Sequence, residues 1–500
     1  MYSSIKKIFI LSTVFMVACV YEKEEKLSLA LDYAQENRQE LEKVLEHYKN
    51  DSLKLAAAHF LILNMPYHYT LDQYYISPQN ERLDYDITMF DSLKNAVNFI
   101  DSLEREGYQL EYEMKPDIKT IDSKFLIENI DLAFAVREKM WVKDVMFSDF
   151  CKYILPYRAQ TEKVSLLRKE IMERFIPLLD SAKVKTYLDA CIVLNNKLKD
   201  VMKYGHTGLP FYPTIDETYR FGIGQCEGLC NLGTYIMRAC GIPVAVDFTI
   251  WTKMDLGHYW CAVLDDDKFY SFEPSEEQPK EHARKFTEIR HLHPSKVYRR
   301  CFEPYVSYME AKDDGYITDL KSPLITDVTD EYLDKTTEFK IKINEEYENT
   351  STQIYLCAFN YYEWCPIAIG YRKDSIGYFG NLIGDNIFII ADAPQKGRLR
   401  IISDPLYVSS NGEVSKLIPD WGNRISFTFD KKKNKSDVKH TLHYWDTDKK
   451  KFVRIESTSS TDTTQIYNQI PSDALLWFTI PEQILNQRIF IIQNDSMKIY

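Results

Sequence analysis

The chain has 500 residues, of which 45% are hydrophobic and 27% charged, a composition typical of soluble globular proteins. This length exceeds what one hydrophobic core usually holds, so we expect two to four domains. The formal charge of −12, with no sustained basic stripe, argues against a nucleic-acid-binding protein, because phosphate recognition needs clustered Lys and Arg.

The first 19 residues have the organisation of an export signal. Lys6 and Lys7 precede an apolar stretch from Ile8 to Ala18, which is too short to cross about 30 Å of hydrocarbon and suits a signal-peptide core. The end of this stretch, Met16-Val17-Ala18-Cys19, resembles a bacterial lipobox, although that motif prefers Leu where Met16 stands. The resemblance implies lipidation of Cys19 and an anchor that holds the chain on a membrane without crossing it. The alternative is an ordinary secretory signal with a chance cysteine.

The segment Glu22-Lys23-Glu24-Glu25 follows at once. It resembles the acidic signal that directs some lipoproteins of the Bacteroides group to the outer face of the outer membrane. We therefore expect a protein of the cell envelope, at the outer membrane and in that case at the cell surface. A plain solvated tether is the alternative reading of these four residues.

Nine further cysteines follow Cys19 and form neither a CxxC pair nor a metal-ligand spacing. They are too sparse for a disulfide scaffold, so we expect most of them to be small buried residues. We also expect no metal ion and no organic cofactor. His291 and His293 have no third ligand nearby in the sequence, which favours a loop over a metal site.

Residues 24–205 have a predominantly helical pattern, and we predict a helical domain over 20–205. One predicted helix begins at the cap Asp51-Ser52 and ends near Leu63, before Pro66. The other predicted helical segments are 27–48, 87–106, 124–140, 161–180 and 185–203.

The pattern between residues 206 and 330 is mixed, and we predict an α+β core there. A helical stretch over 226–240 follows Gly222 and Gly224. Three strands are predicted after it, with a turn at Asp265-Asp266-Asp267 between the last two. They are Val244 to Trp251, His258 to Leu264, and Lys268 to Phe272.

From about residue 335 the pattern is that of strands with polar turns, which indicates β-sandwich domains. A weak break over residues 411–422 divides this part into a β-sandwich over 331–415 and a second β-rich domain over 416–500. The predicted strands are 336–343, 352–359, 386–390, 398–402, 425–429, 441–445, 474–480 and 488–492.

The stretch Gly224-Gln225-Cys226 is the strongest candidate for chemistry. A thiol at the first turn of a helix is partly exposed, and the positive helix end with its unsatisfied N–H groups stabilises a thiolate and an oxyanion. His258 opens a nearby strand and is the candidate base. Glu273 follows the next strand and is the candidate group that orients the imidazole.

Three motifs occur in order over residues 220–275: Gly-x-Cys at Cys226 with Arg238 and Gly241-Ile242-Pro243 downstream, His-x-Trp at His258, and an acid-Pro pair at Glu273. They resemble the transglutaminase-like superfamily, which usually has Asp where Glu273 stands. The helices-first, strands-last layout is also similar to exported proteins of the Bacteroides group. The family resemblance implies a papain-like fold and thiol chemistry on amides, as hydrolase or transferase.

The resemblance implies a Cys226, His258 and Glu273 triad, with Gln225 and Trp260 contacting the substrate. Cys230, one turn along the helix, is the rival nucleophile, and Trp260 could equally be a core residue. Because an exported enzyme is bathed in water, we expect hydrolysis of peptide, protein or glycopeptide amides. The alternatives are a protein-crosslinking transferase and an inactive scaffold that binds glycans or proteins through its β-domains.

Overall fold

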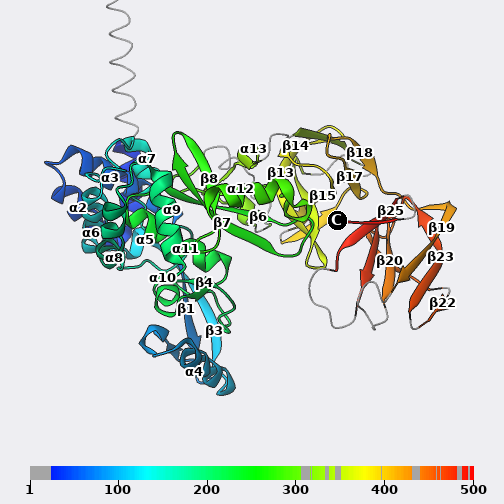
Figure 1. The fold of residues 1–500 in the computed structure, drawn as a ribbon, viewed down its shortest axis with the longest axis horizontal. Coiled ribbons are helices and arrows are strands. Elements are labelled where there is room, and N and C mark those ends of the chain that lie inside the picture. The colour runs from blue at the N-terminus through cyan, green and yellow to red at the C-terminus, as the bar shows by residue number, and fades with distance from the viewer. Residues whose placement is uncertain are drawn as a thin grey trace, which may run out of the picture. The chain divides into compact units, whose positions relative to one another are not determined.

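The computed structural model describes residues 24–305, 316, 318–332, 337–343, 351–395, 397–430, 440–457, 459–461, 463–480, 487–493 and 496–500 (Figure 1). The predicted signal peptide and Cys19 lie outside the described residues. The chain divides into two compact units, which are described separately. Unit 1 comprises the chain up to Val246 with Tyr259–His282 and Arg300–Pro304, and unit 2 comprises Asp247–His258, Ala283–Arg299 and Tyr305–Tyr500.

Among the described helices, none combines the length and the apolar character that a membrane crossing would require.

Unit 1 is built mainly of helices that share one large hydrophobic core. Figure 1 shows α4 (Leu93–Arg105) apart from the other helices, beside β1 (Tyr69–Ile76) and β3 (Gln109–Pro116), and its buried residues belong to a separate, smaller core. By contrast, α11 (Cys226–Ala239) lies among the helices of the large core. Of the 14 residues of α11, 12 are buried, so this helix is the central element of the core. The other helices are α2 (Arg38–His47), α3 (Ser52–Asn64), α4 (Leu93–Arg105), α5 (Asp117–Thr120), α6 (Ser123–Ala135), α7 (Phe147–Tyr153), α8 (Arg168–Ala182), α9 (Tyr187–Leu198) and α10 (Ile215–Phe221).

The predicted helix caps and stops are confirmed where the local chemistry is strong. The side chain of Asp51 accepts a hydrogen bond from the Lys54 backbone N–H at 3.1 Å, and α3 ends at Asn64, before Pro66. The predicted helical segment 27–48 is helical on both sides of one interruption. A 3₁₀ turn interrupts it over Gln35–Asn37, where Gln35 has a left-handed φ of 54°.

The prediction of a purely helical domain over 20–205 is also incomplete. A three-stranded antiparallel sheet lies within it, with the order β2 (Arg82–Leu83), β1 (Tyr69–Ile76), β3 (Gln109–Pro116). The β1 and β3 strands pair over their full length, from Tyr69 opposite Pro116 to Ile76 opposite Gln109. The partners are far apart in the chain, so local patterns do not reveal the pairing.

The end of α11 is fixed by a buried guanidinium and a tight turn. Arg238 donates two hydrogen bonds to the Val244 carbonyl, at 3.0 and 2.9 Å, and one to the Arg158 carbonyl at 2.6 Å. Gly241 has a φ of +76°, and a Cβ there would lie 2.7 Å from Val142. These contacts give a structural reason for Arg238 and Gly241, the Arg and Gly that lie downstream of Cys226 in the first motif.

The mixed core confirms the predicted strands. The strand β7 (Gly257–Asp265), which lies in unit 1 from Tyr259 onward, pairs antiparallel with β8 (Lys268–Phe272), from Cys261 opposite Phe272 to Asp265 opposite Lys268. The unit 2 part of β6 (Val244–Ile250) pairs antiparallel with β9 (Tyr298–Arg300), with Asp247 opposite Arg299 and Phe248 opposite Tyr298, and β9 neighbours β10 (Ile325–Asp327). Two further helices, α12 (Pro279–Glu288) and α13 (Thr329–Tyr332), accompany these strands.

The C-terminal half of unit 2 is made of antiparallel sheets, shown in yellow to red in Figure 1. The first sheet has the order β11-β14-β13-β12-β15-β17-β18, with β16 paired to β15, and two smaller sheets have the orders β19-β23-β22 and β21-β20-β24-β25-β26. The strands are β11 (Thr337–Lys342), β12 (Gln353–Asn360), β13 (Glu363–Lys373), β14 (Ile376–Leu382), β15 (Asn386–Gln395), β16 (Arg398–Ile401), β17 (Leu406–Val408), β18 (Val414–Lys416), β19 (Asp420–Asp430), β20 (Thr441–Asp446), β21 (Lys451–Ile455), β22 (Ser459–Ser460), β23 (Thr464–Ser472), β24 (Leu476–Thr479), β25 (Ile489–Gln493) and β26 (Ser496–Ile499).

The predicted fold class, a mixed chain with helices first and sheets last, is therefore confirmed. Each predicted C-terminal strand has a counterpart, while β13, β14, β17, β18, β21, β22, β23 and β26 were not predicted from the sequence. The domain boundaries remain predictions.

Residues 251–256, called here the β6–β7 loop, are held by side chains from the sheets of unit 2. The Asn360 Nδ2 donates to the carbonyls of Trp251 and Leu256, both at 2.8 Å, and its Oδ1 accepts from the Leu256 N–H at 2.8 Å. Arg488 forms a buried ion pair with Asp255 at 2.7 Å. The loop that leads into β7 is thus tied to β12 and to the C-terminal strands.

Candidate active site at the start of helix α11

The turn that precedes α11 depends on glycine. Helix α10 begins with a capping box, in which Thr214 and Glu217 bond each other's backbone N–H, and ends at Gly222 with a φ of 64°. A Cβ at Gly222 would lie 2.7 Å from the Val201 carbonyl oxygen, so a side chain is excluded there. The chain then forms β5 (Ile223–Gly224), which pairs in parallel with β4 (Lys203–Tyr204), before α11 begins.

Cys226 is the first residue of α11 and is partly exposed, as predicted for a nucleophile at a helix start. Its N-terminal neighbour Gln225 occupies the cap position, but within the described residues its side chain makes no capping hydrogen bond. By contrast, the caps of α3, α4, α6, α9 and α10 each accept one. The first N–H groups of α11 are therefore not capped by the Gln225 side chain.

The rival thiols are less suited to nucleophilic attack. Cys230 is 1% exposed, and burial raises its pKa well above the usual range, with the neighbouring Cys261 adding to the shift. Burial also raises the pKa of Cys240 to about 12 and that of Cys365 to about 11. No disulfide joins any of the nine cysteines in the described part of the chain. Among these cysteines, Cys226 alone combines partial exposure with the first position of a helix, which makes it the best candidate nucleophile.

Glu273 lies directly after β8, in a turn whose backbone is firmly held. Its N–H donates to the Glu277 carbonyl at 3.1 Å, and the buried Asn195 amide donates to the carbonyls of Glu273 and Glu277 at 3.2 and 3.0 Å. The Asn195 Oδ1 also accepts from the Ser275 N–H at 2.8 Å. One amide thus fixes the carboxylate-bearing turn at three backbone groups.

The same turn packs on α11 at a glycine. A Cβ at Gly233 would lie 2.7 Å from Pro274 Cγ and 2.8 Å from Pro274 Cβ. Any side chain at Gly233 would force the Glu273-Pro274 turn away from the helix. The absence of a side chain at this position therefore allows the acid motif to approach the helix that carries Cys226.

Tyr204 links the two ends of this arrangement. It pairs with Gly224, two residues before Cys226, and its pKa is raised by burial and then by its proximity to Cys226 and Glu273. Burial, then Glu227 and Cys226, similarly raise the pKa of Tyr212. Both tyrosines are more than half exposed, at 59% and 58%, so they border the site at the surface.

His282 is a residue of this region that the sequence did not reveal. It lies in α12, its Nε2 is 3.6 Å from Glu273 Oε1, and its ring centroid is 5.8 Å from that of Trp260. The side chain is 3% exposed. A second histidine therefore contacts the carboxylate assigned to orienting the base. No motif accompanies His282, and only the folding of α12 against β8 could have identified it.

His258 belongs to unit 2, as the residue just before the point where β7 passes into unit 1. It is partly buried, and its ring stacks on Trp251 with centroids 5.8 Å apart and an interplanar angle of 19°. It is two residues from Trp260, so both side chains point to the same face of β7. Trp260 is fully buried, which favours a core role over the predicted contact with substrate.

His258, Glu273 and His282 have side chains of the kinds that bind divalent cations. Two imidazoles and one carboxylate form a ligand set that zinc accepts in enzymes. This set overlaps two members of the predicted triad, so a metal and thiol catalysis would compete for the same side chains.

Comparisons with known proteins give remote structural similarities. No protein-family model matches the chain, and no curated protein matches it. Part of the fold is similar to a candidate cysteine protease from Cytophaga hutchinsonii (15% identity, 23% of this chain and 38% of that one, TM-score 0.19). It is also similar to a TGase (12% identity, 34% and 42%, TM-score 0.19) and to red sea bream transglutaminase (8% identity, 63% and 70%, TM-score 0.21).

The matches span about two fifths of the length of the first two structures. With TM-scores of 0.19 to 0.21, these similarities carry no argument about activity, which is argued below from the residues alone.

Proposed function

We propose that this protein is a transglutaminase-like thiol enzyme that hydrolyses amide bonds of peptides, proteins or glycopeptides. The observation that carries the proposal is the pairing of a partly exposed Cys226 at the start of α11 with a Glu273 turn held against the same helix at Gly233. His258 is the proposed base. His258 and Trp260 share one face of β7. The Trp260 ring neighbours the ring of His282, which contacts Glu273, and this arrangement supports the role of His258.

In the proposed reaction, His258 accepts the thiol proton and the sulfur of Cys226 attacks the amide carbonyl carbon. N–H groups at the start of α11 stabilise the resulting oxyanion. The carbon–nitrogen bond breaks as the imidazolium returns the proton to the leaving amine, which leaves a thioester. His258 then takes a proton from water, the hydroxide attacks the thioester, and the acid and the free thiol are released. Glu273 orients the ring and stabilises its charged form.

The nucleophile can be tested without a known substrate. At pH 7, iodoacetamide is expected to alkylate Cys226 about tenfold or more faster than the partly buried Cys301 and Cys365, because thiolate character and access control this reaction. Peptide mapping by mass spectrometry over time measures each rate, and His258→Ala should slow alkylation of Cys226 alone. Equal rates at all three cysteines would contradict the enzyme and favour an inactive glycan- or protein-binding scaffold.

Amine competition separates hydrolase from transferase once turnover is found. A hydrolase releases the acid when a primary amine is present in excess, whereas a transferase forms the new amide. A chelator should leave alkylation and hydrolysis unchanged. Loss of hydrolysis with the chelator, restored by zinc, would instead indicate that His258, Glu273 and His282 bind a metal.

We further propose that the chain is anchored to the cell envelope through lipidated Cys19. In a bacterial host that lipidates exported proteins, the full chain is expected to incorporate an alkyne-tagged fatty acid and to sediment with membranes. Cys19→Ser should lose both properties, and Cys301→Ser should keep them. Labelling that persists in Cys19→Ser would contradict the anchor and support an ordinary secretory signal.

A further inference from the structure

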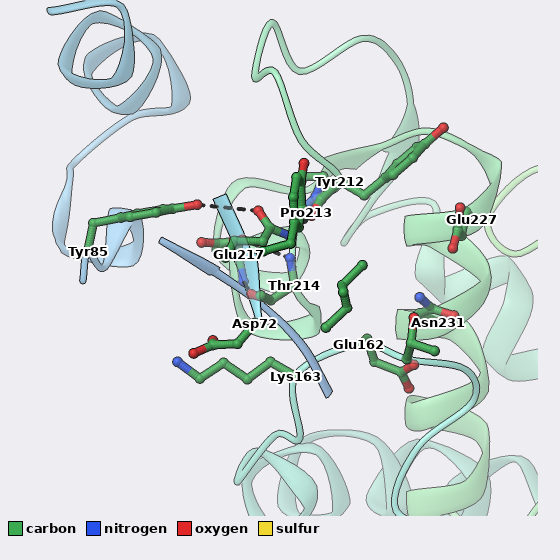
Figure 2. A pocket seen from close by; sticks show the side chains of 14 residues that line it. Asp72, Tyr85, Glu162, Lys163, Tyr212, Pro213, Thr214, Glu217, Glu227 and Asn231 are labelled. Atoms are coloured by element: carbon green, nitrogen blue, oxygen red, sulfur yellow. Dashed lines mark hydrogen bonds between the residues drawn. The ribbon is translucent and has the colours of Figure 1, made fainter. Parts of the chain in front are cut away.

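An open cavity of about 140 Å³ lies in unit 1, beside the first turns of α11 (Figure 2). Its lining includes the rings of Tyr85, Tyr112 and Tyr212 and the amide of Asn231 on α11. One water occupies roughly 10–15 Å³ of such space, so the cavity holds about ten water-sized positions. A single sugar unit has a similar number of heavy atoms, whereas most amino-acid side chains have fewer.

The cavity adjoins the proposed nucleophile along α11. Glu227, which follows Cys226 directly, lines the cavity, and Asn231 lines it about 7.5 Å along the helix axis from Cys226. The lining residue Tyr212 is also close to this helix start, because its pKa is raised by burial first and then by its proximity to Glu227 and Cys226. A substrate whose amide lies at the sulfur can therefore extend a neighbouring group into this cavity.

Asn231 presents a buried hydrogen-bond donor to the cavity. The residue is 7% exposed, and its Oδ1 accepts from the Gln160 Nε2 at 2.8 Å, which fixes the amide orientation. Among the residues that the structure describes, no acceptor is hydrogen-bonded to Asn231 Nδ2. Figure 2 shows this side chain projecting from α11 into the cavity beside Glu227. A buried amide donor fixed in this way favours a ligand that supplies a carbonyl oxygen.

Tyrosine rings provide the open faces of the cavity. Tyr112 on β3 and Tyr212 before α10 are 47% and 58% exposed, and each offers an apolar ring with a hydroxyl group at its edge. Gln73 on β1 holds two parts of this wall, since its Nε2 donates to the Tyr212 carbonyl at 3.1 Å and its Oε1 accepts from the Tyr85 hydroxyl at 3.3 Å. Aromatic faces beside fixed polar groups suit a ligand that combines C–H faces with hydroxyl groups.

Charged residues of the lining act on opposite charges within the protein. Asp72 forms ion pairs with an Arg of β2 and a Lys of β3. Burial lowers the pKa of Arg238, and the charge of Glu162 opposes this shift. Burial raises the pKa of Glu217, and the charge of Lys163 acts in the opposite direction. A ligand of the cavity therefore gains little from a net charge, and neutral hydrogen-bonding groups decide its affinity.

We propose that this cavity binds an N-acetylhexosamine unit of a glycopeptide whose amide bond Cys226 attacks. The link to this reaction rests on the proposed function, whereas the sugar site itself does not. A C–H face of the sugar ring packs on the exposed tyrosine rings, and the Asn231 Nδ2 donates to the acetamido carbonyl oxygen. A plain hexose has no carbonyl oxygen in its ring form, so it leaves this donor without its preferred acceptor.

The sugar site can be tested by binding alone, in the full-length Cys226→Ala variant, with ligand-observed NMR titrations. The probes are the methyl β-glycosides of N-acetylglucosamine and N-acetylgalactosamine, each compared with the matching glycoside of glucose or galactose. We expect at least one N-acetyl sugar to bind about tenfold more tightly than its matched hexose. Asn231→Asp keeps the acceptor for Gln160 and replaces the donor, so it should remove this preference. The matched control Asn80→Asp makes the same change at an exposed turn and should keep it.

Equal affinities within both sugar pairs, or a preference that survives in a folded Asn231→Asp protein, would overturn the sugar site. Thermal melting shows whether that variant folds. If it does not, Tyr212→Ala at the surface provides the test, because it should weaken both members of a pair severalfold, and unchanged binding would overturn the site. An inert Cys226 in the alkylation assay together with selective N-acetylhexosamine binding would instead overturn the proposed function and leave the sugar site in place.

Discussion

Cys226→Ala is expected to abolish amide hydrolysis by the full chain, with a loss of at least about 10³-fold. The proposed reaction forms a covalent bond to this sulfur, and no other thiol among the described residues combines partial exposure with the first position of a helix. The measurement is mass spectrometry of new amine termini in a peptide mixture with randomised positions, followed by initial rates on the best sequence.

Cys301→Ala is the matched control, since it also removes a partly buried thiol of unit 1. It should retain the rate of the unsubstituted protein. If Cys226→Ala keeps more than a few per cent of the hydrolysis rate of the unsubstituted protein, another group must be the nucleophile. A circular dichroism spectrum shared by the variants would rule out unfolding as the cause of any loss.

Gly233→Ala is expected to lower hydrolysis by about 10²-fold although the residue touches no substrate. Its new Cβ would lie 2.7 Å from Pro274 Cγ, so the Glu273 turn must shift outward. A misplacement of about 1 Å in a catalytic group can cost about 10²-fold in rate. The loss should fall mainly on kcat, because the shift affects orientation of the base more than binding.

Gly228→Ala provides a control on the same helix with the same chemical change. A Cβ there would have Thr218 Oγ1 as its nearest contact, at an ordinary 3.6 Å. This variant should keep the rate and gain up to about 1 kcal/mol of stability from the better helix former. A Gly233→Ala protein that folds and hydrolyses at the unsubstituted rate would show that the position of the Glu273 turn is not needed.

The sequence was most informative where a local rule determines the structure. The glycines before Cys226, the cap at Asp51 and the aspartate turn between β7 and β8 each fix a backbone conformation over a few residues, and the structure agrees with them. The three members of the predicted triad, Cys226, His258 and Glu273, could be predicted because each lies in one of three sequence motifs that occur in order. Their mutual geometry could not, because it depends on packing.

The missed features all depend on contacts between distant segments. The β1–β3 pairing joins residues about 40 positions apart, and the charged residues in Gln109–Pro116 hide its strand character. The break at Gln35 carries no Gly or Pro to announce it. His282 reaches Glu273 only once α12 has folded back, and the cavity beside α11 is assembled from at least five separate stretches of chain.

The anchoring of the β6–β7 loop by Asn360 and Arg488 has a consequence for how the protein tolerates heat and truncation. Ordering each loop residue costs roughly 1–2 kcal/mol of backbone entropy, which these buried contacts offset. His258 follows this loop within two residues of its end. Any reaction that uses the His258 imidazole should therefore be lost when heating unfolds the C-terminal sheets. A shortened chain that ends before β12 would keep the Cys226 thiol but lose the contacts that hold the loop before His258.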